Sequence, residues 1–207
     1  MKTVCILSQK GGSGKTTLAI NLAVASQLKG KSAMIADMDS QQSSSMWHTA
    51  REEDFPYVQA TDSKGLKQLH AAAEKQGFDH FFIDTAPTSN KDSLEAVEIA
   101  DVIAVTCKPS IMDLRAISNT IDLIEMAKLK DKCKAFMILT MVEHYSTRDR
   151  EDSAALLKQL KMKVCPHFLG TRVAYRRSLI EGEGVIEYEP KGKASLEIQA
   201  IHKFMKI

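Results

Sequence analysis

The chain has 207 residues, of which 44% are hydrophobic, so it is long enough for one substantial core and short for two. Its 28 basic and 26 acidic residues leave a formal net charge of +2, which is too small to indicate a nucleic-acid partner by itself. No charged-then-apolar leader precedes the first strand-like segment and no apolar run approaches the roughly 18 residues of a membrane helix, so we expect one domain spanning residues 1–207, without secretion or membrane insertion.

A glycine-rich stretch follows the first apolar run and leads into an apolar helical segment. It reads Gln9-Lys10-Gly11-Gly12-Ser13-Gly14-Lys15-Thr16-Thr17. Three glycines in four positions let successive backbone N–H groups converge on one anion, and the start of the helix adds its own free N–H groups. The pattern predicts a phosphate-binding loop, in which Lys15 reaches the β- and γ-phosphates and the Thr16 hydroxyl binds Mg²⁺.

Apolar runs bounded by polar residues or glycine recur along the rest of the chain, at residues 3–7, 32–36, 81–83, 102–106, 135–140 and 164–168. Segments of helical period lie between most of them, as is typical of a parallel sheet with helices on both faces. We therefore expect a doubly wound α/β fold with a mostly parallel sheet. In such folds the ligand lies beyond the carboxyl ends of the strands.

Helix boundaries are readable at two places. Gly30 follows the first helical segment and is a natural helix stop, whereas Ser110 with Asp113 three residues later is typical of a helix start. The second helix has an apolar stripe that we expect to face the core: Met112, Ala116, Ile117, Ile121, Ile124 and Met126. The mixed-charge run at residues 148–152 predicts an exposed loop and helix start.

Acidic residues follow two of the apolar runs. Asp37 and Asp39 come after residues 34–36, and Asp84 comes after residues 81–83. A dry strand that ends in aspartate holds a hard anionic oxygen where Mg²⁺ can use it, so we expect Asp84 to belong to the metal site together with Thr16.

These motifs resemble those of the ParA/MinD group of ATPases. Residues 10–16 resemble the group's deviant Walker A loop, with Lys10 at the position of its signature lysine and Gln9 where the usual phosphate loop has glycine. Residues 37–41 resemble its first switch, with Ser40 in place of proline, and Ala86 replaces a proline of the second switch. The pattern continues at residues 106–110 and 187–190, closest to the short ParA type that lacks an N-terminal helix-turn-helix.

The resemblance implies roles that the residues alone do not assign. ATP and Mg²⁺ would be the cofactors, bound by residues 10–17, with Lys10, Lys15 and Asp39 as the catalytic residues. Two subunits would face each other across two ATP molecules, Lys10 would contact the partner's phosphates, and Asp39 would position the attacking water. The alternative for Lys10 is a positive field near its own nucleotide. Thr140 and Arg172 would approach the adenine.

The resemblance also implies that the ATP-bound dimer binds DNA without sequence preference and positions a plasmid, chromosome or protein assembly. A ParB-like or adaptor protein would stimulate its weak hydrolysis, in a cytoplasmic, nucleoid-associated setting. Between residues 161 and 193 there are seven basic residues against four acidic ones. Arg172, Arg176, Arg177, Lys191 and Lys193 are therefore the expected DNA-binding residues.

Other functions of this loop class have their own sequence requirements. A MinD-like membrane-cycling ATPase would need an added amphipathic C-terminal helix, whereas residues 194–207 fall where the group has its last domain helix. The nitrogenase iron-protein type needs cysteine soon after Asp84, yet the next is Cys107. A tyrosine kinase of this class would end in a tyrosine cluster, which is absent. The four cysteines are widely spaced and are expected to be reduced thiols.

Overall fold

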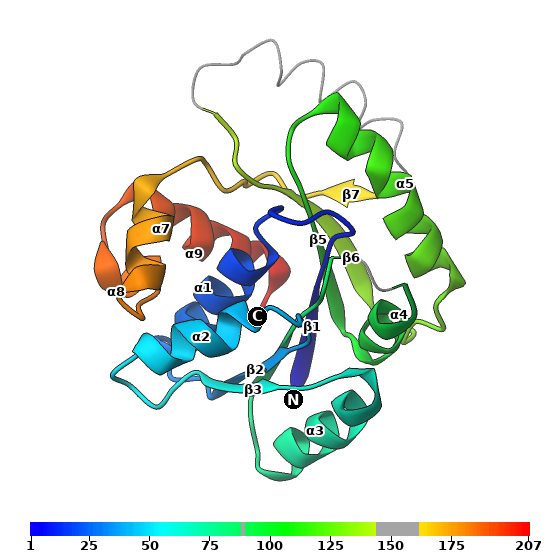
Figure 1. The fold of residues 1–207 in the computed structure, drawn as a ribbon, viewed down its shortest axis with the longest axis horizontal. Helices are drawn as coiled ribbons and strands as arrows, with labels where there is room; N and C mark the ends of the chain where they lie inside the picture. The colour runs from blue at the N-terminus through cyan, green and yellow to red at the C-terminus, as the bar shows by residue number, and fades with distance from the viewer. Residues whose placement is uncertain (88–89, 144–161) are drawn as a thin grey trace.

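The computed structural model describes residues 1–87, 90–143 and 162–207. Its centre is a seven-stranded sheet in the order β3-β2-β4-β1-β5-β6-β7, and every pairing in it is parallel (Figure 1). The strands are β1 (Lys2–Leu7), β2 (Ala33–Asp37), β3 (Tyr57–Ala60), β4 (His80–Asp84), β5 (Val102–Cys107), β6 (Lys134–Leu139) and β7 (Lys163–Val164). The expected doubly wound α/β fold is confirmed.

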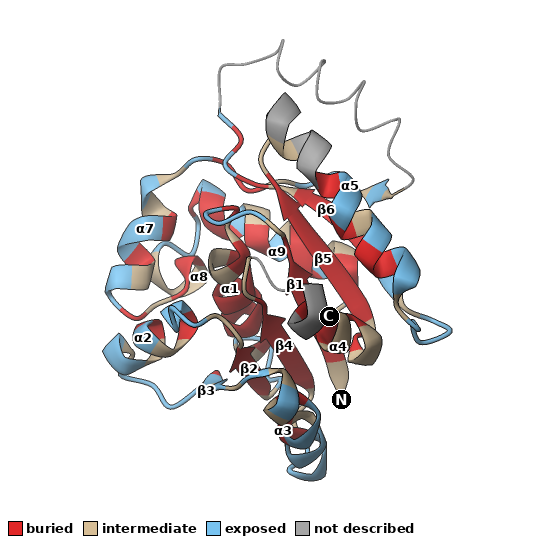
Figure 2. Ribbon diagram, turned by 45° about the vertical axis from the view of Figure 1, so that its right-hand side comes forward, coloured by how far each residue is buried: buried red, intermediate tan, exposed pale blue. Residues whose placement is uncertain are grey.

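Helices cover both faces of this sheet, as Figure 1 shows. They are α1 (Lys15–Gln27), α2 (Ser43–Ala50), α3 (Ser63–Lys75), α4 (Asn90–Ile99), α5 (Ile111–Met126), α7 (Val173–Ile180), α8 (Val185–Tyr188) and α9 (Lys193–Met205). One core lies between the sheet and α1, α2, α7, α8 and α9, and the other lies between the sheet and α3, α4 and α5. The five central strands are buried along most of their length (Figure 2), which explains their near-continuous apolar sequences.

The two edges of the sheet are where the sequence was least informative. β3 was not predicted, because it is a four-residue edge strand whose side chains are mostly exposed and form no apolar run. At the other edge, the apolar run at residues 164–168 was predicted as a strand, but only Lys163 and Val164 pair with β6. Pro166 has no backbone N–H and cannot continue the ladder.

The predicted helix boundaries agree with the structure. Gly30 has a φ of 74° just after α1, and the Ser110 side chain accepts a hydrogen bond from the backbone of Asp113 at the start of α5. Within the predicted stripe of α5, Ile117 and Ile124 are buried, but Met126 is 80% exposed, so its assignment to the core is wrong. It lies two residues, or about 200° of helix rotation, after Ile124, so it is on the opposite face of α5 and points away from the sheet. Residues 148–152 and Lys161 lie outside the described residues.

The last helix, α9, packs its apolar face on α1 and the sheet. Ile198, Ile201 and Met205 are buried there, as expected of a domain helix. In the described part of the chain, no helix has the length and apolar character that crossing a membrane requires.

His202 of α9 is buried in a network that requires its neutral form. Lys29 donates from Nζ to the His202 Nδ1 over 2.8 Å, and Nε2 lies 3.0 Å from the Ser26 hydroxyl, which itself donates to the Leu22 carbonyl. A protonated ring would have no lone pair for Lys29 and would place two positive charges in contact. Burial, with Lys29 and then His80 and Lys2 adding to it, lowers the pKa of His202 from 6.5 to about 4.

This network predicts a loss of stability in acid. Because the pKa of His202 is lower in the native state than in the unfolded chain, the contribution is complete above about pH 6.5 and is lost as the pH falls toward 4. His202→Gln stays neutral at every pH and serves as the matched control. In urea titrations at pH 7.5 and 4.5, the free energy of unfolding of the wild type should fall by roughly 1–3 kcal/mol more than that of the variant. Parallel losses would contradict the assignment.

Candidate nucleotide-binding site

The predicted phosphate loop connects β1 to α1 at the carboxyl edge of the sheet. Gly12 and Gly14 have φ values of 65° and 84°, which only glycine adopts without strain, and Gly14 is the N-cap of α1. No side chain caps this helix. Its first N–H groups, with the positive end of the helix dipole, are therefore available to an anion.

Two threonines from neighbouring strand ends support the loop from behind. The Thr140 hydroxyl, just after β6, donates to the Ser13 carbonyl over 2.7 Å. The Ser13 hydroxyl lies 3.0 Å from the hydroxyl of Thr106 in β5. Both contacts are buried, so they fix the loop on the sheet before any ligand binds. The structure thus gives Thr140 a supporting role that the sequence did not suggest.

Lys15 lies at the bottom of this loop and is only 6% exposed. Burial lowers the pKa of its ammonium, while Asp84 and Asp39 oppose that shift. Its Nζ contacts the Lys10 carbonyl at 3.5 Å. A cation held here with weak partners is well placed to bind phosphate oxygens.

The predicted metal residues come together next to Lys15. The Asp84 Oδ2 accepts a 2.7 Å hydrogen bond from Ser44, and the nearby Thr16 hydroxyl favours the charged form of this carboxylate. The Asp84 Oδ1 is fully buried and has no hydrogen-bond partner among the described residues. Burial raises the pKa of Asp84 to about 6. An orphaned carboxylate oxygen beside a hydroxyl is a donor set that suits Mg²⁺ directly or through a water, so these residues fit the metal.

Asp37, the last residue of β2, and Asp39, two residues later, have different surroundings. Asp37 is buried and accepts hydrogen bonds from the backbone and hydroxyl of Ser45 and from the backbone of Asp39, which shapes the turn into α2. Asp39 is partly exposed, and its Oδ1 accepts a hydrogen bond from the Gln41 backbone. The structure thus places Asp39 at the edge of the site, close enough to influence Lys15. Its role in positioning water stays a prediction.

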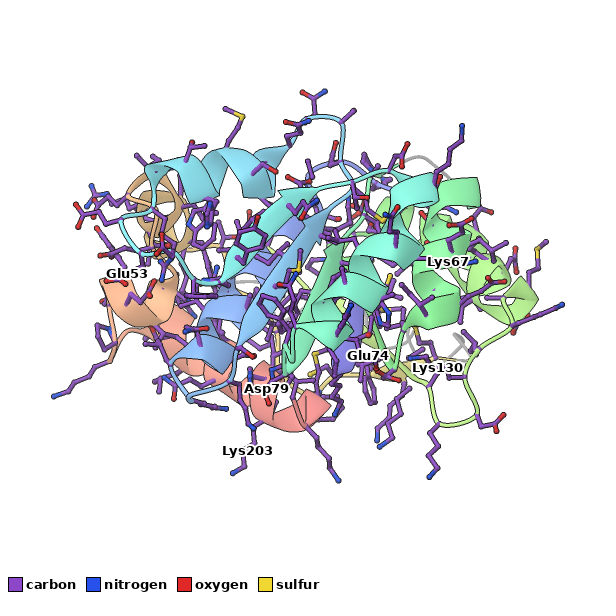
Figure 3. All side chains as sticks on the ribbon, turned by 90° about the horizontal axis from the view of Figure 1, so that it is seen from below. Glu53, Lys67, Glu74, Asp79, Lys130 and Lys203 are labelled. Atoms are coloured by element: carbon purple, nitrogen blue, oxygen red, sulfur yellow. The ribbon has the colours of Figure 1, made fainter. Side chains whose placement is uncertain are left out.

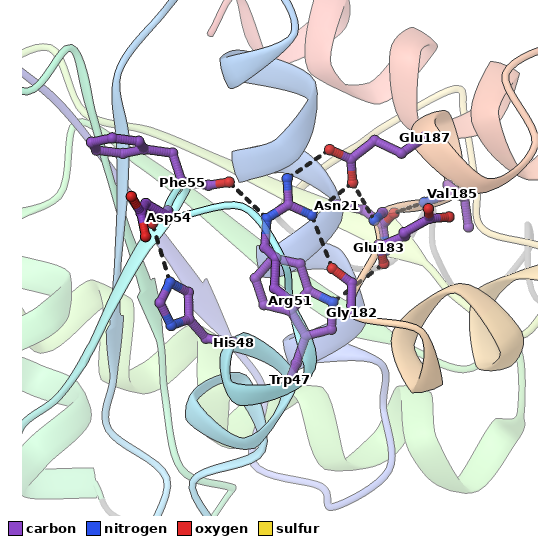
Figure 4. Close-up of polar contacts among 11 residues, drawn as sticks. Asn21, Trp47, His48, Arg51, Asp54, Phe55, Gly182, Glu183, Val185 and Glu187 are labelled. Atoms are coloured by element: carbon purple, nitrogen blue, oxygen red, sulfur yellow. Dashed lines mark hydrogen bonds and ion pairs between the residues drawn. The ribbon is translucent and has the colours of Figure 1, made fainter.

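Helix α2 is anchored at both ends. Ser44 and Ser45 contact the two buried aspartates at its start, as described above. At its end, Arg51 forms a bidentate ion pair with Glu187 at 2.6 and 2.9 Å and donates to the carbonyls of Gly182 and Phe55 (Figure 4). Its guanidinium also lies 5.2 Å from the centre of the Trp47 ring. The serine run and Arg51 carry no motif, so the sequence did not identify them.

A cavity of about 410 Å³ opens beside Gly14 and Thr17, at the helix end of the phosphate loop. It is lined by Thr140, Met141, Leu169, Gly170, Thr171, Arg172, Tyr175, Arg176 and Leu179. Thr140 and Arg172 were predicted to approach the adenine, and both line this cavity. Its position and mixed apolar lining suit a nucleobase.

Four of the predicted DNA-binding residues are exposed. Arg176 and Arg177 lie on α7, and Lys191 and Lys193 lie at the start of α9. Arg172 is different, because its guanidinium is paired with Glu197 in the wall of the cavity and is 23% exposed. Its contribution to DNA binding stays a prediction with less geometric support than the other four have.

Lys10 has a partner that the sequence did not reveal. Its Nζ lies 2.7 Å from the Oδ1 of Asp113 in the first turn of α5. The pair is half exposed on the lysine side. Lys10 therefore has an ion-pair partner within its own subunit in this structure.

The parallel sheet holds a glycine loop whose helix has no side-chain cap. Beside it lie the buried Lys15 and an Asp84 oxygen that has no hydrogen-bond partner among the described residues. Together these features define a P-loop nucleotide-binding protein. The sequence model of the CobQ/CobB/MinD/ParA nucleotide binding domain matches residues 4–185. The chain belongs to this family, and the expected membership of the ParA/MinD group of ATPases is confirmed.

Individual relatives agree with this placement. The chain is 27% identical over 205 residues to the maintenance of carboxysome distribution protein A of Gloeobacter kilaueensis, covering 98% of this chain and 91% of that one. The fold is similar to MinD of Aquifex aeolicus, with a TM-score of 0.77, 21% identity and coverage of 100% and 97%. It is also similar to MinD of Pyrococcus horikoshii OT3 complexed with Mg-ADP, with a TM-score of 0.75, 18% identity and coverage of 98% and 95%.

The support of the loop by Thr140 is testable by a nearly isosteric change. Thr140→Val removes the hydrogen bond to the Ser13 carbonyl and leaves that buried acceptor unsatisfied, so the free energy of unfolding should fall by about 1 kcal/mol. The affinity for ATP should also fall, by roughly 3- to 10-fold, because the loop is less well preorganised. Thr140→Ser keeps the hydroxyl and should bind ATP like the wild type in equilibrium titrations. Equal behaviour of the two variants would contradict this role.

Proposed function

We propose that this protein is a Mg²⁺-dependent ATPase whose ATP-bound dimer binds DNA without sequence preference and positions a cargo, with hydrolysis releasing the dimer. The observation that carries the proposal is the convergence of Lys15, Thr16 and Asp84 on one dry site beneath an open phosphate loop. A cation, a hydroxyl and a carboxylate in this arrangement bind a Mg²⁺–phosphate complex. Bound Mg²⁺ would neutralise the charge that develops on the phosphates.

Asp39 is the proposed residue that positions the attacking water. Its carboxylate lies next to the site, yet the metal side is occupied by Asp84 with Ser44 and Thr16. Asp37 is excluded from this role because its two oxygens accept hydrogen bonds from Ser45 and Asp39. Asp39 can therefore orient a water without being needed for nucleotide binding.

Dimerisation on ATP would require Lys10 to change partners. In the single subunit its ammonium is held by Asp113, and a contact with the phosphates of a partner subunit requires this ion pair to break. The γ-phosphate of the partner subunit's ATP would offer a stronger anion than one half-exposed carboxylate does. ATP would thus favour the dimer.

Lys10→Ala is expected to bind ATP as a monomer and fail to dimerise. Sedimentation velocity with a non-hydrolysable ATP analogue and Mg²⁺ measures this directly. Asp113→Asn is the matched variant: it frees Lys10 from the same ion pair and should dimerise at least as readily as the wild type. If Lys10→Ala dimerises normally, the contact with the partner subunit is wrong, and Lys10 acts only through its positive field on the nucleotide of its own subunit.

DNA binding is proposed to involve Arg176 and Arg177 with the neighbouring lysines. Arg176→Glu with Arg177→Glu should abolish the ATP-dependent binding of two unrelated duplexes equally, since contacts to phosphates carry no sequence information. Because Arg176 also lines the cavity, Arg177→Glu with Lys193→Glu tests the surface without touching that lining. Fluorescence anisotropy at several salt concentrations should show a slope reduced by roughly 0.9 for each DNA phosphate that the variant no longer neutralises.

The control for this experiment lies on the opposite side of the sheet. Lys64→Glu with Lys67→Glu reverses the charge of two exposed lysines on α3, and Lys67 is labelled in Figure 3. This variant has the same change in net charge and should bind DNA like the wild type. If it loses binding as the arginine variants do, the effect comes from net charge and the proposed surface is wrong.

The proposed cargo is a protein assembly, with a plasmid or a chromosome as the other candidates. The name of the Gloeobacter kilaueensis relative refers to the distribution of carboxysomes, which favours this choice. An adaptor protein that connects the cargo to the ATPase and stimulates hydrolysis is part of the proposal.

A further inference from the structure

The loop between β5 and α5 brings a third lysine to the phosphate loop. Lys108 follows β5 directly, and its Nζ lies 3.9 Å from the position that a β-carbon on Gly12 would occupy. Lys108 and Lys10 both line a small pocket with Ser13, Thr106 and Asp113. No motif in the sequence assigned a function to this residue.

The position of Lys108 is fixed by the same contacts that hold the phosphate loop. Thr106, two residues before it, contacts the Ser13 hydroxyl, and Ser110, two residues after it, caps α5. The main chain that carries Lys108 is therefore attached to the phosphate loop on one side and to a helix start on the other. The ammonium of Lys108 is delivered by a short, well-anchored loop.

The charges around Gly12 show why this lysine matters. Asp113 compensates the charge of Lys10 at 2.7 Å, whereas Lys108 has no carboxylate within ion-pair distance among the described residues. Lys108 does act on Asp113, whose pKa is lowered partly by its field. Within one subunit, Lys108 is thus the lysine near Gly12 whose charge is not neutralised by an ion pair among the described residues.

The phosphate loop has two distinguishable ends. Gly14 and Thr17 border the cavity that suits the nucleobase, whereas Gly12 does not line that cavity and lies next to Lys108. A nucleotide whose base occupies that cavity would direct its phosphate chain along the loop toward Gly12. Its last phosphate would then lie closest to the ammonium of Lys108.

We propose that Lys108 is a phosphate-binding residue that contacts the terminal phosphate of a bound nucleoside triphosphate. The inference rests on the nucleotide binding proposed above and adds to it a way of distinguishing triphosphate from diphosphate within one subunit. An ammonium next to a phosphate in a partly buried loop forms a charge-assisted hydrogen bond. A nucleoside diphosphate lacks the terminal phosphate and cannot form this bond with Lys108.

The test compares affinities for fluorescent ATP and ADP analogues with Mg²⁺, using the full chain at a protein concentration where it is monomeric. Lys108→Gln should weaken binding of the ATP analogue about 10-fold and that of the ADP analogue less than about 3-fold. Lys108→Arg keeps the charge and should remain within about 3-fold of the wild type for both. Lys203→Gln removes an exposed lysine at the remote end of the molecule and should change neither (Figure 3).

Two results would overturn the assignment: unchanged ATP affinity of Lys108→Gln, or equal losses for the two nucleotides. Thermal unfolding of each variant without nucleotide verifies that it is folded. Lys15→Gln separates the two hypotheses, because it should abolish binding of both analogues if the site is a nucleotide site. If Lys15→Gln abolishes binding while Lys108→Gln has no effect, only the role of Lys108 fails; if Lys15→Gln binds normally, the nucleotide site itself is wrong.

Discussion

The burial of Lys15 beside Asp84 is the constraint on which the rest of the site depends. A buried ammonium and a buried carboxylate both disfavour their charged forms, and burial shifts the pKa of each in that direction. An Mg²⁺–triphosphate complex reverses this, because its anionic oxygens suit Lys15 and its metal suits Asp84. The free site therefore carries groups whose charges are best compensated by the ligand.

Such a site needs a rigid frame, and the parallel sheet provides it. Leu7, Asp37, Asp84, Cys107 and Leu139 end five adjacent strands at one edge, so the loops that follow them converge. These strand ends bring together the glycine loop, Asp37 with Asp39, Asp84, Lys108 and Thr140. The hydrogen bonds of Thr140 and Ser13 connect the loop after β6, the glycine loop and the end of β5. The residues of the site come from distant parts of the chain, and these hydrogen bonds hold them in place where the segments meet.

What could be predicted from the sequence follows from the range of each interaction. The phosphate loop could be predicted because a few adjacent residues determine its backbone geometry. The position of Asp84 beside it could be predicted because strand ends converge in any parallel sheet. The partners Ser44 and Asp113 were not, because a contact between distant segments depends on how α2 and α5 lie on the sheet. The edge strand β3 shows the same limit, since its exposed side chains form no apolar run, whereas Met126 was misplaced because it lies on the helix face opposite to Ile124.

Helix α2 connects the chemistry to the far side of the nucleobase cavity. Its first turn holds Asp84 through Ser44 and Asp37 through Ser45. Its end is tied by Arg51 to Glu187 of α8, whose backbone continues from α7 in the cavity wall. The eight residues of α2 are thus held at both ends, by the two aspartates on one side and by α8 on the other. The Arg51–Glu187 pair is thus a structural link between α2, whose serines hold Asp84 and Asp37, and the helices beside the cavity.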